Sequence, residues 1–304
     1  MRRIPGETWR KRRTLGAVVL ALVVCARGLA SGEASRSPAT FGQELSRIGK
    51  KGIGPSQMVE AQAVAVDSQG FVYAGDRELG RVQRFNSAGK LESLHYFDEG
   101  RITSLACDRA GVLYVLIERR LLRYDPKTWT LLGEVEHPGD SEFLAVAPGP
   151  DGGVIALRDN SHDDILLIDR NGKITRTFHD AVYAVSDYSL HEPFVAVDRG
   201  GFIYVGDEGT HRIYKFDPQG RFISRFGFSA DPADPSRENI HGLAIDSQGH
   251  LWVAGWSSVN VFSSDGRFLE HFGDRRAHDL VIDDQDALYA AEWTQVTKYA
   301  AGKR

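Results

Sequence analysis

Short apolar runs that end in a polar turn recur six times along the chain. The recurring segments are residues 63–71, 104–112, 145–153, 194–202, 242–250 and 279–287. Their turn positions follow one another at intervals of 41, 41, 49, 48 and 37 residues. A self-similar period of this length is typical of a repeat protein in which each unit packs against its neighbours.

Each repeat predicts four short β-strands. Residues 64–66 are continuously apolar, which is typical of a buried inner strand, and an Asp-x-x-Gly turn separates them from a second strand over residues 71–74. Residues 212–216 alternate in polarity, which predicts a half-buried third strand. The most polar strand, residues 221–226, is predicted to be the outermost. Six such units predict an all-β fold, a six-bladed β-propeller of four-stranded antiparallel blades.

The last repeat lacks its fourth strand, because only a few residues follow Tyr299. Residues 42–49 near the amino terminus align without a gap on residues 266–273, which form the fourth strand of the fifth repeat. The amino-terminal strand is therefore predicted to complete the last blade and to pair with the strand around residues 296–299. Such closure protects sheet edges that an open array would expose.

The first 34 residues have the pattern of a secretory signal peptide. A basic stretch ends at Arg13, and residues 15–26 form an uncharged run that is too short to span a bilayer. Small residues predict cleavage after Ala30 or Ala34, which leaves residues 35–304 as a single propeller domain.

Three other interpretations of this amino-terminal segment remain open. The segment could stay attached as a membrane anchor, Arg12-Arg13 could belong to a twin-arginine signal, or Cys25 could carry a lipid anchor. In the main interpretation the protein is exported to the periplasm or the cell exterior, and Cys107 is the one cysteine left in the mature chain.

The composition is that of a globular protein, with 42% hydrophobic and 26% charged residues. The formal net charge is −4, and it becomes −9 once the basic first 34 residues are set aside. A chain this acidic lacks the overall field that attracts nucleic acid, so we expect no nucleic-acid partner. We expect no membrane span in the mature chain, and a monomer.

Residues 205–216, after the Ala-Val-Asp of residues 196–198, closely resemble the NHL repeat, and residues 74–76 with 81–85 resemble it less fully. The resemblance covers about residues 41–304. It implies a six-bladed propeller, and it leaves function open because NHL propellers serve as RNA-binding surfaces, protein-interaction modules, extracellular sensors and lyases.

The residues just before each inner strand are expected to ring one mouth of the central channel. They are Gln62, Thr103, Leu144, Pro193, His241 and His278. His191 precedes the fourth inner strand and could reach the same mouth. Trp256 and Trp293 lie in the predicted loops of the two histidine-bearing repeats, where they would either pack in the core or line an aromatic pocket. Gln62, Thr103, the three histidines and these two tryptophans are the candidate ligand-binding residues.

The segments that begin at His241 and His278 resemble the metal-binding signatures of the peptidyl-hydroxyglycine amidating lyases, which are NHL-type propellers with a catalytic zinc. The resemblance implies zinc bound by His241, His278 and His191, with one open coordination position. The chain departs from the lyases because His241 and His278 belong to neighbouring repeats, whereas the lyase histidines come from alternating blades. Two other interpretations of the pair are rim residues that bond neighbouring loops, and ligand binding without metal.

Two functions follow from these observations. The main prediction is an exported propeller without enzymatic activity that binds a protein, a peptide or a cell-envelope ligand at the channel mouth. The alternative is a metal-dependent lyase or hydrolase, resembling peptidylamidoglycolate lyase, with a histidine-based site at that mouth.

Overall fold

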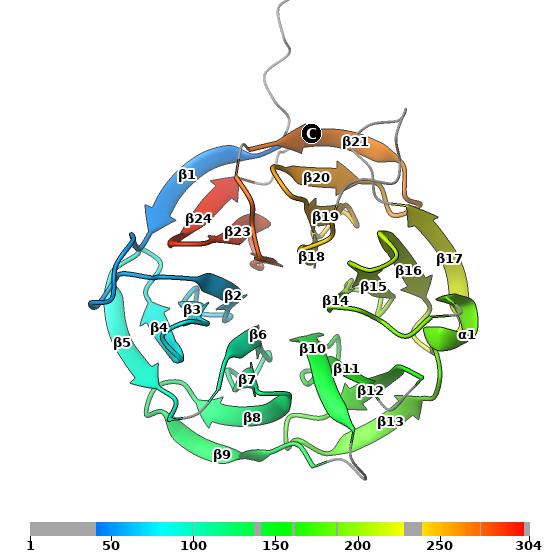
Figure 1. Cartoon of the computed structure of the whole chain (residues 1–304), viewed down its shortest axis with the longest axis horizontal. Helices are drawn as coiled ribbons and strands as arrows, with labels where there is room; N and C mark the ends of the chain where they lie inside the picture. Colours follow the sequence, from blue (N-terminus) through cyan, green and yellow to red (C-terminus); the bar gives the residue numbers. More distant parts are fainter. Residues whose placement is uncertain are drawn as a thin grey trace, which may run out of the picture. The chain divides into compact units, whose positions relative to one another are not determined.

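Six four-stranded antiparallel sheets stand around a ring in the computed structural model of this chain (Figure 1). The structure describes residues 41–98, 100–136, 141–159, 162–186, 188–227, 239–273 and 275–300. The predicted six-bladed propeller is therefore confirmed, and each sheet corresponds to one sequence repeat.

The strands of each blade follow one another outward from the channel. Blade 1 contains β2 (Ala61–Val66), β3 (Val72–Asp76), β4 (Arg81–Phe85) and β5 (Leu91–Tyr96). Blade 2 contains β6 (Ile102–Cys107), β7 (Leu113–Ile117), β8 (Arg120–Asp125) and β9 (Thr130–Glu134). Blade 3 contains β10 (Glu142–Pro148), β11 (Val154–Asp159), β12 (Asp164–Ile168) and β13 (Ile174–Phe178).

The other three blades repeat this order. Blade 4 contains β14 (Pro193–Val197), β15 (Ile203–Asp207), β16 (Arg212–Phe216) and β17 (Phe222–Gly227), and the short helix α1 (Tyr183–Ser186) precedes it. Blade 5 contains β18 (Gly242–Ile245), β19 (Leu251–Ala254), β20 (Val259–Phe262) and β21 (Phe268–Phe272). Blade 6 contains β22 (Asp279–Ile282), β23 (Ala287–Glu292), β24 (Gln295–Ala300) and β1 (Gln43–Ile48).

The Asp-x-x-Gly segment makes the turn between the first two strands of a blade. In blade 1, Asp67 Oδ1 accepts hydrogen bonds from the backbone N–H groups of Gln69 (2.9 Å) and Phe71 (3.0 Å). Its Oδ2 accepts a hydrogen bond from the Tyr73 hydroxyl at 2.8 Å. The same carboxylate thus shapes the turn and satisfies a buried hydroxyl on the second strand, as buried polar groups require.

The core lies between neighbouring blades, where the inner and second strands bury their side chains. Most second strands contribute one large aromatic residue, and Tyr73, Tyr114, Tyr204, Trp252 and Tyr289 are fully or almost fully buried. Trp252 fills in blade 5 the core position that Tyr73 fills in blade 1 and Tyr204 in blade 4.

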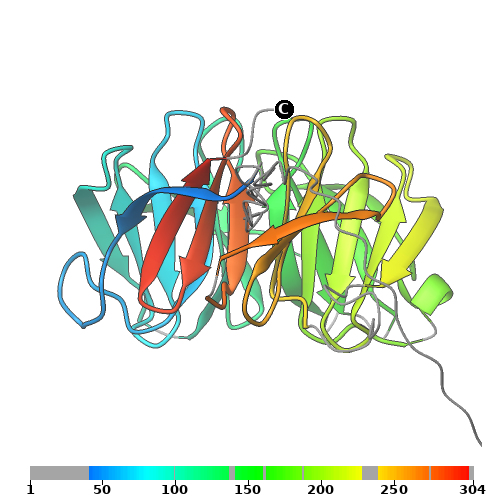
Figure 2. The same ribbon diagram turned by 90° about the horizontal axis from the view of Figure 1, so that it is seen from above.

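The ring is closed by the amino-terminal strand, as predicted. β1 pairs antiparallel with β24, and the register places Glu44 opposite Tyr299 and Ile48 opposite Val296. Figures 1 and 2 show the blue β1 running alongside the red β24, although the two lie at opposite ends of the sequence. Blade 6 is therefore built from both ends of the described chain.

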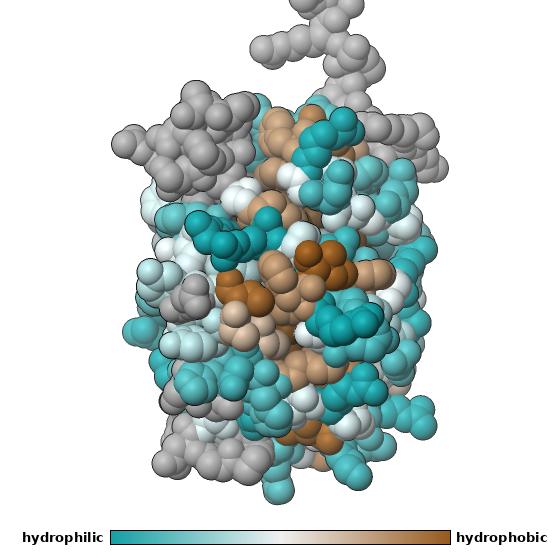
Figure 3. Space-filling view, turned by 90° about the vertical axis from the view of Figure 1, so that its right-hand side faces the viewer, coloured by the Kyte–Doolittle hydropathy of each residue, from teal (hydrophilic) through white to brown (hydrophobic). Residues whose placement is uncertain are grey.

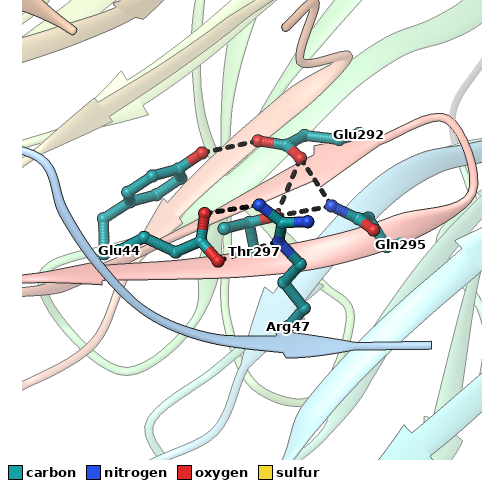
Figure 4. Close-up of polar contacts among 6 residues, drawn as sticks. Glu44, Arg47, Glu292, Gln295 and Thr297 are labelled. Carbon is teal, nitrogen blue, oxygen red and sulfur yellow. Dashed lines mark hydrogen bonds and ion pairs between the residues drawn. The ribbon is translucent and has the colours of Figure 1, made fainter. Parts of the chain in front are cut away.

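Two groups of polar contacts lie in this closing blade, one within β1 and one between β23 and β24 (Figure 4). Glu292 accepts hydrogen bonds from the hydroxyl groups of Thr297 and Tyr299, both at 2.7 Å. On β1, Arg47 binds both carboxylate oxygens of Glu44 at 2.8 Å. The hydrogen bond and the charge of Glu44 raise the pKa of Arg47.

The outer strands are the most exposed of each blade, as their polarity predicts. Figure 3 shows the side of the ring that carries β17 and α1, where hydrophilic side chains surround a narrow apolar stripe. Phe222 and Ile223 of β17 are among the exposed large apolar residues. Within the described residues, no helix has the length and apolar character needed to cross a membrane.

Candidate functional site

The six residues predicted to ring the channel mouth fall into two groups, which are β-bulge residues and residues at or directly before the start of an inner strand. Gln62, Thr103 and Leu144 sit at register shifts of β2, β6 and β10, so they are the extra residues of β-bulges. Pro193 begins β14, and His241 and His278 directly precede β18 and β22. Bulges turn a side chain away from the regular alternation of a strand and are frequent beside functional sites.

His241 and His278 face each other across the boundary between blades 5 and 6. Their backbone N–H groups donate to the carbonyls of Ala254 (2.9 Å) and Ala291 (2.7 Å), which continues the ladder of each blade by one residue. Their ring centroids are 6.4 Å apart, and the residues are only 3% and 5% exposed. The fold thus brings these two histidines together at the mouth.

Trp256 and Trp293 flank the histidine pair and do not belong to the core. The Trp293 ring meets His278 edge-on with centroids 4.7 Å apart, and Trp256 lies 5.7 Å from His241. Trp256 is 57% exposed and Trp293 is 46% exposed. The Trp293 carbonyl also accepts a hydrogen bond from the Ala61 N–H, which places this tryptophan beside the bulge at Gln62.

Arg276 joins this group although the sequence analysis did not single it out. Its guanidinium carbon lies 4.4 Å from the centroid of the Trp256 ring, and its Nη2 is 3.4 Å from His241 Nδ1. A guanidinium can only donate, so Nδ1 of His241 accepts and the proton of the neutral ring lies on Nε2. The one signal that could have found Arg276 is its position two residues before a mouth histidine.

Both imidazoles are neutral at neutral pH. Burial lowers the pKa of His241 to about 4, and the charge of Arg276 and the neighbouring His278 contribute to the shift. Burial likewise lowers the pKa of His278 to about 4, with further contributions from Arg276 and Arg77. Two guanidinium groups therefore lie close enough to act on His278.

Buried polar atoms without a partner are concentrated at this mouth. Among the described residues, twelve buried side-chain nitrogen and oxygen atoms lack a hydrogen-bond partner. Five of them belong to the mouth, and they are Gln62 Oε1, Arg77 Nε, His241 Nε2, Arg276 Nε and His278 Nε2. Each such atom costs about 1–3 kcal/mol unless water or a ligand pairs with it, which makes the mouth a candidate binding site.

Glu208 forms the acidic side of the mouth, and the sequence analysis missed it as well. Its Oε2 lies 4.0 Å from His241 Nδ1, and its Oε1 accepts a hydrogen bond from Asn239 at 2.7 Å. Burial raises the pKa of Glu208 to about 7, and the neighbouring Glu192 raises it further. Glu208 is therefore a group that gains and loses a proton near neutral pH.

Two of the predicted mouth residues stand apart from the histidine pair. His191 is exposed, and its backbone N–H donates to Asp207 at 2.7 Å. His191 contributes to the pKa of Glu208, so it lies on the acidic side of the mouth. Thr103 is exposed on β6, in a blade that does not adjoin the pair.

The donors at the mouth do not fit a catalytic zinc ion in this arrangement. Within the described residues, no group of three or more His, Cys, Asp or Glu side chains is placed to hold a metal ion. The guanidinium of Arg276 touches His241 and would repel a divalent cation there. The zinc interpretation therefore rests on the sequence resemblance alone.

Inside the channel, the Asp279 carboxylate caps a free strand edge. It accepts hydrogen bonds from the N–H groups of Val64 (2.9 Å) and Leu280 (2.8 Å), and burial raises its pKa to about 7. A cavity of about 200 Å³ continues from there to the opposite end of the channel, where the Asp-x-x-Gly turns lie. Asp279 thus closes blade 6 against blade 1.

Comparison with known proteins places the chain by fold. No family model and no curated protein matches it by sequence. Among solved structures, it is similar to a streptogramin B lyase (TM-score 0.61, 10% identity), with 84% of this chain and 97% of that chain covered.

Two further structures are similar over most of both chains. One is regucalcin, a calcium-binding protein from Agrobacterium tumefaciens (TM-score 0.62, 15% identity, 86% and 96% covered). The other is a gluconolactonase from Xanthomonas campestris (TM-score 0.62, 16% identity, 84% and 97% covered). At these identities the likeness establishes a six-bladed propeller fold that lyases and lactonases share, and it assigns no activity to this chain.

Proposed function

We propose that this protein is an exported binding protein, and that its ligand inserts a polar end group into the channel mouth between His241 and His278. The observation that carries the proposal is the pair of buried imidazole Nε2 atoms without a partner inside the protein. A hydrogen-bonding ligand would satisfy both, because their rings are 6.4 Å apart and lie on adjacent blades.

The surroundings of the pair favour ligand binding over a structural role on the rim. A rim histidine that joined neighbouring loops would form hydrogen bonds to those loops through its ring nitrogens. In both rings, however, Nε2 has no hydrogen-bond partner in the described part of the protein. Trp256 and Trp293 keep large exposed faces beside the pair, and exposed aromatic side chains are typical anchors of binding sites. A protein chain end, a short peptide or an envelope component can present a suitable end group.

Affinity selection tests this proposal without a known ligand. The mature protein would be incubated with a pool of random tetrapeptides, half with free and half with amidated carboxyl termini, and retained peptides would be identified by mass spectrometry. We expect the wild type to retain a subset of peptides, and the double variant His241→Ala, His278→Ala to retain none while its melting temperature stays nearly unchanged.

A matched control uses two exposed histidines away from the mouth, His179 and His271. Their double replacement by alanine should retain the same peptides as the wild type. If the mouth variant retained the wild-type peptides, or lost its fold without any effect on a ligand, the histidines would be structural and the proposal would fail.

One observation favours an enzyme as the second candidate function. Glu208 ionises near neutral pH beside a neutral histidine, which is a combination suited to general acid–base catalysis. The gluconolactonase among the similar structures makes a lactone the first substrate to test. Hydrolysis of glucono-δ-lactone by the wild type, but not by Glu208→Gln, would support this candidate, and the zinc content after purification with zinc tests its metal-dependent form.

A further inference from the structure

Positive charge is concentrated at one point of a chain that is otherwise acidic. Arg276 lies on the blade 5 side of His278 and Arg77 on the blade 1 side, and both guanidinium groups lower the pKa of that histidine. The chain as a whole has a net charge of −4. The two guanidinium groups therefore make a positive sector beside His278, separate from the acidic side of the mouth at Glu208.

Each of the two guanidinium groups has an N–H group without a hydrogen-bond acceptor among the described residues. Arg77 approaches Glu60 only to 3.9 Å, and its Nε is buried without a partner. Arg276 stacks on Trp256 and donates to His241, and its Nε is likewise buried without a partner among the described residues. Guanidinium N–H groups are donors only, so each of these atoms requires an acceptor.

His241 adds a third donor to this set. Because Nδ1 accepts from Arg276, the ring carries its proton on Nε2, and that atom is buried without a partner. Three unpaired donors, Arg77 Nε, Arg276 Nε and His241 Nε2, thus lie around His278. Hydrogen bonds from charged donors to an ionised acceptor are about twice as strong as neutral ones.

Access to these donors is narrow. His241 and His278 are almost completely buried, whereas Trp256 and Trp293 above them are about half exposed. Because the donor atoms are buried and the tryptophans are exposed, we expect only a small flat end group to reach the donors, with the rest of the ligand at the level of the tryptophans. The Trp293 ring is nearly perpendicular to His278 and is 46% exposed, so it offers apolar surface for that part of the ligand.

We propose that the channel mouth recognises a carboxylate, which accepts from the two arginines and His241, and that the substituent of the carboxylate packs on Trp293. This inference rests on the proposed binding function and names the chemical class of its ligand. A free organic acid with a planar substituent and the carboxyl terminus of a peptide share this chemistry.

The acid and amide halves of the tetrapeptide pool provide the test. Exchange of a terminal carboxylate for an amide keeps the shape of the end group and removes its charge. We expect wild-type protein to retain peptides with free carboxyl termini at least tenfold more strongly than their amidated counterparts. Equal retention of the two forms would overturn the carboxylate proposal and leave the binding function standing; retention of no peptide at all would contradict both.

Variants of the two arginines test whether these residues cause the preference for a free carboxyl terminus. Arg276→Gln and, separately, Arg77→Gln should each reduce the acid-over-amide preference to less than threefold, while the melting temperature reports whether each variant is folded. Arg109, at the opposite end of the channel, supplies the matched control Arg109→Gln, which should keep the full preference. A preference that survives both mouth substitutions would overturn the assignment.

Calorimetric titration with N-acetyl-L-phenylalanine and its amide separates the two sources of the carboxylate. An affinity for the free acid within threefold of the best peptide supports a small organic acid as the ligand. A much weaker affinity, again with no binding of the amide, supports a peptide carboxyl terminus. Binding of the amide as tightly as the acid would contradict the proposal for both sources.

Discussion

His241 and His278 show how strongly the surroundings of a side chain decide its chemistry. The sequence identifies two histidines at equivalent positions of adjacent repeats, which is compatible with a metal site, a rim contact or a ligand site. Burial and the guanidinium of Arg276 lower the pKa of both rings, so they act as neutral hydrogen-bonding groups. Only a neighbour that the sequence pattern does not mark, Arg276, fixes which nitrogen of His241 carries the proton.

The low pKa of the two histidines predicts a loss of stability in acid. Between pH 6.5 and about 4 the unfolded chain binds protons at His241 and His278 that the folded protein does not, so the free energy of unfolding falls as the pH is lowered through this range. Urea denaturation at pH 7, 6, 5 and 4 should show a smaller loss for the variant His241→Gln, His278→Gln than for the wild type.

The raised pKa of Asp279, caused by burial, acts in the opposite direction, because its ionisation disfavours the folded state as the pH rises toward 7. This contribution is common to the wild type and the glutamine variant and cancels in their difference. The exposed His271 serves as the control, and His271→Gln should follow the wild type at every pH. Identical pH profiles for the wild type and the mouth variant would show that the two rings are not held neutral.

Among the strands, contacts between the outer strands of neighbouring blades help to hold the blades together. A glycine just before an outer strand packs against a phenylalanine near the end of the outer strand of the preceding blade. The pairs are Gly220 with Phe178, Gly266 with Phe226, and Gly42 with Phe272. The third pair belongs to the amino-terminal strand β1. This strand therefore continues the same contact pattern as the internal repeats, which explains why residues 42–49 align with residues 266–273.

Replacement of Gly42 by alanine should destabilise the ring through this contact. Gly42 has φ +78°, and a Cβ atom there would overlap the ring of Phe272. We expect a backbone cost of about 1–2 kcal/mol for the left-handed conformation, and about 1–3 kcal/mol more for overpacking. Gly111→Ala is the matched control, because Gly111 has φ +85° and no described neighbour within 4 Å of the added Cβ. Equal losses of unfolding free energy for the two variants would contradict a packing role for Gly42.

For the whole molecule, closure of blade 6 makes the amino-terminal end of the described chain essential to the fold. β1 supplies the outer strand of a sheet whose other strands come from the carboxyl-terminal end. A signal peptide ahead of β1 would therefore have to be removed without loss of this strand. Both predicted cleavage points, after Ala30 and after Ala34, lie before Gln43, the first residue of β1.

Export itself stays a prediction, because residues 1–40 lie outside the described part of the structure. We expect intact-mass measurement of the protein from a secreting host to give a chain that starts at Ser31 or Ser35. A mass that includes residues 1–30 would indicate a membrane anchor, and a diacylglycerol on Cys25 would indicate a lipoprotein.

The sequence by itself determined the number of blades, the order of strands within each blade and the closure by β1. These features follow from local sequence patterns, because the apolar run, the Asp-x-x-Gly turn and the alternating strand all lie within one repeat of about 43 residues. The ring of residues at the channel mouth also follows from the repeat, because equivalent positions of each blade must lie around the same axis.

Only the tertiary structure decided which of those positions form a site. Arg77 and Glu208 directly follow the second strands of blades 1 and 4, so the repeat places both at the mouth, whereas Arg276 lies in the connection to blade 6, which no periodic pattern marks. Burial, which shifts the pKa values of the two histidines, is likewise a property of the assembled ring. The repeat therefore specifies the scaffold, whereas the chemistry at its mouth arises from contacts between residues far apart in the sequence.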